Sequence, residues 1–275
     1  MRFFATLSLL AAVPGLLSAQ SFFENNTEKR LTCENGNNRG WNDGKREQSC
    51  EIREYPGAAS SRLTIDGSQN GGVEVKGWDR SDTLVRAKVQ TWAPTAAEAK
   101  ALASQINVQA AGAAIRADAP RFGEERGWSV SYEVFVPHNT GLDLKTHNGG
   151  VSIRDVRGDI KFDAVNGGVH LARVAGNVTG QTKNGGLSVE LAGNRWEGTG
   201  MDVSTTNGGV KMTLPENYSA RLESSTRNGG FNIDYPVTVT GTLRINKEIA
   251  ANLGAGGALV RLTTVNGGVS IRKKS

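Results

Sequence analysis

Residues 141–153 read GLDLKTHNGGVSI, and variants of this segment recur along most of the chain. The tripeptide at its centre, Asn-Gly-Gly, occurs seven times, starting at Asn70, Asn148, Asn166, Asn184, Asn207, Asn228 and Asn266. From Asn148 onwards, the steps between successive copies are 18, 18, 23, 21 and 38 residues. Repetition at such a period indicates stacked repeats rather than one isolated turn.

The residues on either side of each Asn-Gly-Gly alternate between apolar and polar. From Asn148 onwards, the positions six before, three after and five after the Asn are apolar in every copy. In the Asn148 copy these are Leu142, Val151 and Ile153, and Ser152 is the polar residue between the last two. Alternation with a period of two predicts strands that bury one face.

Two architectures are compatible with this pattern. In an antiparallel β-hairpin meander, each Asn-Gly would form a two-residue turn with positive φ angles, and Leu144 would lie opposite Ile153. In a parallel β-solenoid, each Asn-Gly-Gly would turn a corner, and equivalent residues would stack in columns. Two features favour the solenoid: Thr stands two residues before the Asn in five of the seven copies, and the first steps keep a constant 18 residues.

We therefore predict a mostly β fold, with a parallel β-solenoid of ~18–23-residue repeats over residues 140–275. In either architecture the Asn and Gly residues are expected at positive-φ turn positions, which L residues with larger side chains adopt poorly. The predicted structural turn residues are Asn148, Gly149, Gly150, Asn166, Gly167, Gly168, Asn184, Gly185, Gly186, Asn207, Gly208, Gly209, Asn228, Gly229, Gly230, Asn266, Gly267 and Gly268.

The last copies lead to two expectations about the C-terminal end. The 38-residue step suggests a repeat that lacks Asn-Gly-Gly, between Pro236 and Gly254. The chain ends shortly after Ile271, so the basic run 272–274 is expected at an open sheet edge. Charge at such an edge would discourage end-to-end association.

The repeat pattern resembles the bacterial putative-adhesin family of Asn-Gly-Gly β-strand repeats. The resemblance is carried by residues 142–153 and by the segment Trp128 to Pro137, WSVSYEVFVP, and it covers roughly residues 61–275. It implies an extracytoplasmic β-solenoid, and it transfers no catalytic residue.

Four sections are expected along the chain. Residues 1–20 are typical of a signal peptide, with a basic start, an apolar run and small residues before the cleavage site. Residues 21–60 are polar and contain the two cysteines, and residues 61–139 form a β-rich lead-in section. The latter includes one helix as a plug or cap, beginning at a Thr95–Glu98 capping box. Residues 140–275 are the repeats.

The two cysteines, Cys33 and Cys50, are predicted to form a disulfide, because an exported chain meets an oxidising environment. The segment between them is rich in Gly, Asn and charged residues and has no hydrophobic pattern of its own. A bridge across a loop of this length stabilises by about 3 kcal/mol.

Residues with obvious chemistry are few. The three histidines, His138, His147 and His170, have no metal-ligand spacing, and we expect no metal and no cofactor. No Gly-x-Ser-x-Gly motif is present. The net charge of +5 is scattered rather than clustered with aromatic residues, which argues against nucleic-acid binding. After removal of the signal peptide, no stretch has the ~20 apolar residues that a membrane helix needs.

These observations favour an exported, non-enzymatic scaffold. We expect an adhesin-like protein, periplasmic or extracellular, that binds an unidentified partner of the cell envelope or surface. The alternative is a carbohydrate-active β-helix enzyme with a site in the insertions near Trp196 and Tyr218. Its acidic residue would then be a carboxylate such as Glu197 or Glu216.

Overall fold

The structure, a computed structural model, describes residues 31–33, 46–235 and 247–274. The predicted signal peptide therefore lies outside the described residues, as do much of the loop between the cysteines and part of the 38-residue step. Over the described ranges the protein is mostly β with one helix, as predicted. No helix in this part of the chain is long and apolar enough to cross a membrane.

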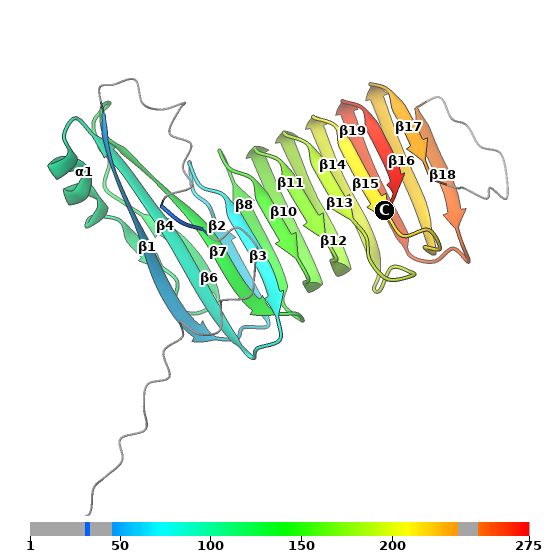
Figure 1. Cartoon of the computed structure of the whole chain (residues 1–275), viewed down its shortest axis with the longest axis horizontal. Helices are drawn as coiled ribbons and strands as arrows, with labels where there is room; N and C mark the ends of the chain where they lie inside the picture. The colour runs from blue at the N-terminus through cyan, green and yellow to red at the C-terminus, as the bar shows by residue number, and fades with distance from the viewer. Residues whose placement is uncertain (1–30, 34–45, 236–246, 275) are drawn as a thin grey trace, which may run out of the picture. The chain divides into compact units, whose positions relative to one another are not determined.

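The strands of the described residues form two ten-stranded sheets (Figure 1). In spatial order, the first sheet contains β1 (Glu47–Ala58), β4 (Asp82–Ala93), β7 (Gly127–Pro137), β3 (Val73–Trp78), β9 (Val151–Arg154), β11 (Val169–Ala172), β13 (Leu187–Glu190), β15 (Val210–Leu214), β20 (Val269–Lys273) and β17 (Phe231–Asp234). The second sheet contains β18 (Glu248–Leu253), β16 (Ala220–Asn228), β19 (Leu259–Asn266), β14 (Gly200–Asn207), β12 (Ala175–Asn184), β10 (Arg157–Asn166), β8 (Gly141–Thr146), β2 (Arg62–Asp66), β6 (Ala114–Asp118) and β5 (Asn107–Gln109).

Each Asn-Gly-Gly joins a strand of the second sheet to a strand of the first. We call such a pair of strands a unit and name it by its Asn; the Asn148 unit is β8 and β9. Strands of neighbouring units pair in parallel and in register, so that Ile160 lies between Leu142 and Val178. The hairpin alternative is wrong, because Leu144 and Ile153 belong to different sheets and pair with other units.

The apolar columns predicted from the sequence form the core between the two sheets. Leu142 and Leu144 of β8 and Val151 and Ile153 of β9 are all almost completely buried and belong to one core cluster. The polar residues between them, such as Ser152, lie on the outer faces. The two-residue alternation therefore places one apolar face of each strand in the core.

An uninterrupted row of asparagine side chains runs along the Asn-Gly-Gly corner. Each Asn after the first donates from its amide nitrogen to the amide oxygen of the Asn before it in the row, at distances of 2.8 to 3.0 Å. The spatial order of this ladder is Asn70, Asn148, Asn166, Asn184, Asn207, Asn266 and Asn228. Such in-register amide ladders stabilise stacked strands.

The threonine column lies just inside the ladder and is buried. Four of its hydroxyls donate to the carbonyl of the first Gly in the neighbouring motif, at 2.7 to 2.8 Å: Thr182 to Gly167, Thr205 to Gly185, Thr264 to Gly208 and Thr226 to Gly267. The fifth, Thr146, donates to Gly149 of its own motif at 2.8 Å. The hydroxyl therefore satisfies a corner carbonyl that turns away from the strand ladder.

The expected positive φ angles at this corner are wrong. None of the Asn or Gly residues of the seven motifs lies in the positive-φ region. The first Gly of each motif is required because neighbouring units approach closely at this point. A Cβ on Gly167 would lie 2.1 Å from the carbonyl oxygen of Gly149, and one on Gly185 would lie 2.1 Å from that of Gly167. Only glycine tolerates so short a distance between backbones.

The last unit of the chain is inserted between two earlier ones. Strand β19 lies between β14 and β16, and β20 lies between β15 and β17. The described part of the segment from Pro236 to Gly254 contains β18, which pairs antiparallel with β16 instead of forming a further parallel unit. The prediction of a repeat without Asn-Gly-Gly is therefore wrong for this part.

The expected open edge at the basic tail is also wrong. Because β20 is internal to the first sheet, Arg272 pairs with Thr213 of β15 on one side and with Asp234 of β17 on the other. The two lysines contact the side of β15. Lys273 pairs with Glu216 at 2.6 Å, and Lys274 pairs with Glu190 at 2.7 Å. The backbone N–H of Lys274 donates to the carbonyl of Leu214.

The lead-in section adds the long antiparallel strands β1, β4 and β7 to the first sheet. The predicted helix is present as α1 (Ala96–Ala103), and the Thr95 hydroxyl accepts the backbone N–H of Glu98, as the capping box predicted. Arg53 of β1 donates to the carbonyls of Ala103 and Ile106 and so caps the end of the helix. The Cys33–Cys50 disulfide is formed, with Cα atoms 5.8 Å apart.

Candidate functional site

The Asn148, Asn166, Asn184 and Asn207 units also have a second corner, where the chain returns from the first sheet to the second. In the Asn148 unit this corner contains Asp155, and in the Asn166 unit it contains Arg173. The two positions are equivalent, because the residues just before them, Arg154 and Ala172, are paired in the sheet. Both residues have positive φ angles, 57° and 53°. Positive φ is uncommon for residues other than glycine and costs of order 1 kcal/mol or more.

Asp155 and Arg173 face each other across the two units. The guanidinium donates two parallel hydrogen bonds to the carboxylate, each 2.6 Å long. Both side chains are more than a third exposed, at 36% and 38%, so the pair itself contributes at most about 1 kcal/mol. The strained corner is therefore held by the surrounding strands, and the paired charges are presented to solvent in a defined position.

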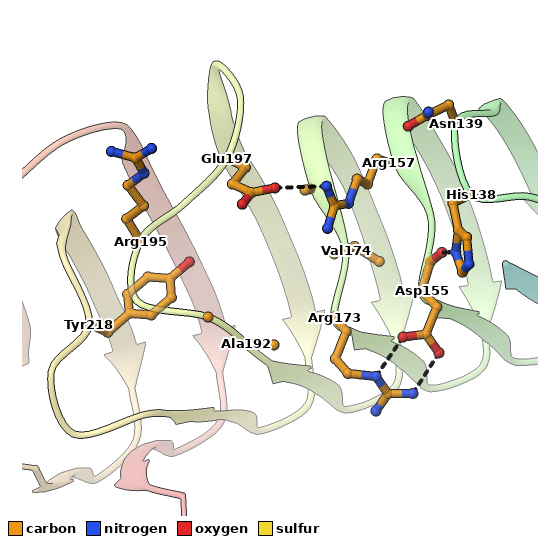
Figure 2. A pocket seen from close by; sticks show the side chains of 12 residues that line it. His138, Asn139, Asp155, Arg157, Arg173, Val174, Ala192, Arg195, Glu197 and Tyr218 are labelled. Atoms are coloured by element: carbon orange, nitrogen blue, oxygen red, sulfur yellow. Dashed lines mark hydrogen bonds and ion pairs between the residues drawn. The ribbon is translucent and has the colours of Figure 1, made fainter. Parts of the chain in front are cut away.

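A pocket of about 420 Å³ lies along these second corners. The pocket extends to the Asn184 unit. The 23-residue step from Asn184 to Asn207 makes room there for a longer loop between β13 and β14. The lining residues are His138, Asn139, Asp155, Arg157, Arg173, Val174, Ala175, Ala192, Gly193, Arg195, Glu197 and Tyr218 (Figure 2). The pocket thus combines small apolar side chains with converging polar groups, as small-molecule sites do.

Most of the charges that line the pocket are paired. Arg157 and Glu197 form an ion pair at 3.0 Å, with both side chains more than half exposed. The Nδ1 of His138 donates to the carbonyl of Asp155 at 2.6 Å, and its Nε2 lies 3.1 Å from the carboxylate of Asp79.

Arg195 is the exception. Within the described ranges its side chain makes no hydrogen bond or ion pair, and Figure 2 shows it apart from the two marked ion pairs. The lining residues therefore present three guanidinium groups and two carboxylates, of which one guanidinium is uncompensated.

The two aromatic residues named for the alternative enzyme site are both buried. Trp196 is 6% exposed, and its indole N–H donates to the carbonyl of Gly176 at 3.1 Å. It packs into the core and offers no exposed ring to a sugar. Tyr218 is 2% exposed but lines the pocket, and burial together with the nearby Glu197 raises the pKa of its hydroxyl.

The pocket lacks the surroundings of a catalytic carboxyl pair. A general acid of this type requires a carboxyl in an apolar environment or beside a second carboxylate. Here Asp155 and Glu197 each face an arginine. Glu216, the other carboxylate named for the enzyme alternative, pairs with Lys273 and does not line the pocket.

Outside the pocket, the most buried charge is Glu133 on the outer face of the first sheet. It is completely buried, lies 3.0 Å from the ammonium group of Lys76, and accepts a hydrogen bond from Arg86. This cluster is fully paired and joins β3, β4 and β7. Among the described residues there is no group of three or more His, Cys, Asp and Glu side chains that could hold a metal ion.

The three histidines lie in different surroundings. His138 lines the pocket, His147 is exposed beside the asparagine ladder, and His170 is half-buried on the outer face of β11. Burial lowers the pKa of His170, and the nearby Arg154 and Arg173 act in the same direction.

The sequence analysis missed the three pocket arginines, Arg157, Arg173 and Arg195. One signal could have pointed to two of the lining residues. Asp155 and Arg173 stand 18 residues apart, at equivalent repeat positions, with opposite charges. In stacked units such a spacing places the two side chains next to each other.

Comparison with known protein families finds a match over the repeat part of the chain. Residues 136–272 match the Toastrack family, DUF4097. No curated protein matches the chain in sequence.

Solved structures to which the chain is similar include a "putative cell adhesion protein" from Clostridium sporogenes ATCC 15579, at 10% identity and a TM-score of 0.41, covering 83% of this chain and 100% of that one. A "putative adhesin" from Bacteroides fragilis NCTC 9343 has 11% identity and a TM-score of 0.35, covering 82% and 97%. A "putative lipid binding protein" from Parabacteroides distasonis ATCC 8503 has 12% identity and a TM-score of 0.29, covering 82% and 97%. Likeness at this distance transfers no ligand to this chain.

Proposed function

We propose that this chain, whose residues 136–272 match the Toastrack family, is an exported, non-enzymatic and adhesin-like scaffold that binds a cell-envelope or surface partner. The observation that carries the proposal is the second-corner pocket. It holds an unpaired guanidinium, while both of its carboxylates are engaged by arginines. This arrangement suits recognition of a ligand better than acid–base catalysis.

The scaffold that we infer is a parallel β-solenoid with one unit per turn. The in-register parallel pairing of neighbouring units and the asparagine ladder support this architecture. A solenoid presents equivalent positions of successive units at the spacing of neighbouring strands, about 4.8 Å. Side chains from several units can therefore contact one extended partner.

Export to the periplasm or the cell exterior is part of the proposal. The Cys33–Cys50 disulfide supports it, because such bonds persist in oxidising compartments and are rare in the cytosol. The proposed signal peptide over residues 1–20 points in the same direction.

A binding and cleavage screen tests the scaffold against the enzyme alternative. The purified protein would be incubated with acidic and neutral envelope polysaccharides, and both retention on the immobilised polymer and new reducing ends would be measured. We expect retention on at least one polymer and no cleavage.

Glu197→Gln and Glu216→Gln provide matched variants, because only the first changes the pocket. Bond cleavage that is lost in Glu197→Gln but kept in Glu216→Gln would establish the enzyme alternative. Absence of retention on every envelope fraction would reject the scaffold.

A further inference from the structure

Resting on the proposed function, we propose that the second-corner pocket binds the carboxylate of an acidic saccharide, with Arg195 as the residue that pairs with it. Arg195 stands at the pocket, with its backbone held on both sides. The N–H of Ser219 donates to the carbonyl of Asn194 at 2.7 Å, and the N–H of Trp196 approaches the carbonyl of Ser219 at 3.4 Å. The buried indole of Trp196 anchors the same turn. The guanidinium is thus an unpaired group on a fixed backbone.

A guanidinium group matches a carboxylate through two parallel N–H donors. The same geometry is already present in the pocket, where Arg173 holds Asp155 with two bonds of 2.6 Å. Arg195 has no such partner among the described residues. A carboxylate of the ligand would give Arg195, the third guanidinium of the pocket, the partner that it lacks.

The remainder of the pocket suits a sugar ring rather than a bare ion. Its volume of about 420 Å³ lies within the range of small-molecule sites. Val174, Ala175 and Ala192 supply small apolar contacts. The Tyr218 hydroxyl is protonated at neutral pH, as tyrosine hydroxyls ordinarily are, so it can donate to a ligand oxygen.

The ion pair between Arg157 and Glu197 can be exchanged for contacts with the ligand. Both side chains are more than half exposed, and ion pairs of this kind contribute little to stability. Glu197 can therefore accept a hydrogen bond from a sugar hydroxyl without a large cost, while Arg157 stays beside the ligand.

Calorimetric titration of the full chain with digalacturonate tests the inference. Galactobiose, a disaccharide without carboxylates, is the control ligand. We expect binding of digalacturonate that weakens at least ten-fold in Arg195→Gln and weakens with added salt. Arg195→Lys should bind with intermediate affinity, because it keeps the charge but loses the paired donors. Arg121→Gln is the matched control, since Arg121 is also exposed but does not line the pocket, and it should bind as the original chain does.

Three results would overturn the inference: no binding of digalacturonate, equal binding of galactobiose, or unchanged affinity in Arg195→Gln. Displacement of digalacturonate by an equal concentration of inorganic phosphate would show an anion site without saccharide recognition and would also reject it. Thermal unfolding of each variant shows whether the fold is intact. Retention on other envelope material without digalacturonate binding would leave the scaffold standing and reject only this inference, whereas cleavage of the probe would reject the non-enzymatic function.

Discussion

Replacement of Gly185 by Ala is expected to destabilise the protein by about 3 kcal/mol, whereas the same replacement at Gly186 should change stability by less than about 1 kcal/mol. The two glycines are adjacent in one Asn-Gly-Gly motif, and neither has a positive φ angle. They differ in what a Cβ would meet. On Gly185 it would lie 2.1 Å from the carbonyl oxygen of Gly167, and on Gly186 it would lie 3.6 Å from that of Gly209.

The magnitude follows from the hydrogen bonds at this corner. The atoms that a Cβ on Gly185 would meet belong to the backbone of Gly167 and Gly168, which cannot rotate away as a side chain can. The two units must therefore separate locally by about 1 Å before the distance becomes an ordinary van der Waals contact. That movement would break or strain three bonds: the Thr182 hydroxyl to Gly167 at 2.8 Å, the Gly167 N–H to Asn184 at 3.0 Å, and the Asn184 amide to Asn166 at 2.8 Å. At about 1 kcal/mol for each bond, the loss is about 3 kcal/mol.

Urea unfolding followed by circular dichroism measures the difference directly. A loss of about 3 kcal/mol corresponds to a fall in melting temperature of roughly 6–12 °C for a chain of this size. The Gly186→Ala variant should unfold within about 4 °C of the original chain. Identical unfolding midpoints for the two variants would refute the view that close approach of the units requires the first glycine.

Three further predictions concern stability. The variant Asn184→Ala should lose about 1–2 kcal/mol, measured by urea unfolding, because it removes one amide donor and one amide acceptor from the ladder; an unchanged midpoint would show that the ladder contributes nothing. Reduction of the Cys33–Cys50 bridge should lower the free energy of unfolding by about 3 kcal/mol, and equal melting curves with and without reductant would contradict this. The pKa of His170 is lowered in the folded state, so below about pH 6.5 the unfolded chain binds more protons and stability falls as the pH falls. The variant His170→Gln should show a weaker dependence of stability on pH in the range between the ordinary histidine pKa and the lowered pKa of His170. Urea unfolding curves at several pH values measure this dependence, and an unchanged slope of stability against pH would exclude His170 as its cause.

Much of the site could not be predicted from the sequence. The pocket brings together His138, Arg157, Arg173, Arg195 and Tyr218, which no local pattern connects. Their proximity depends on which units lie side by side and on how the insertion before β14 folds back. Trp196, which marked the insertion of the alternative enzyme site, is buried: the loop turns it into the core, where the carbonyl of Gly176 accepts its N–H.

The sequence by itself determined the features that depend on local chemistry. Alternation of apolar residues set which face of each strand is buried, and Thr95 with Glu98 set the start of the helix. A constant repeat length favoured parallel stacking in register over hairpins, because equivalent residues must meet. These properties need only neighbouring residues and a period.

The order of the units was decided only in the tertiary structure. The asparagine, threonine and glycine contacts of one unit are nearly the same whichever unit lies beside it, so the repeat pattern cannot tell neighbours apart. The Asn266 unit therefore lies between the Asn207 and Asn228 units without any change in the ladder. Contacts outside the repeat pattern accompany this position: the N–H of Ala255 donates to the hydroxyl of Ser219 where the chain passes the start of β16, and Lys273 and Lys274 pair with Glu216 and Glu190. The repeated contacts determine that units stack in register, but they do not determine the order in which the units stack.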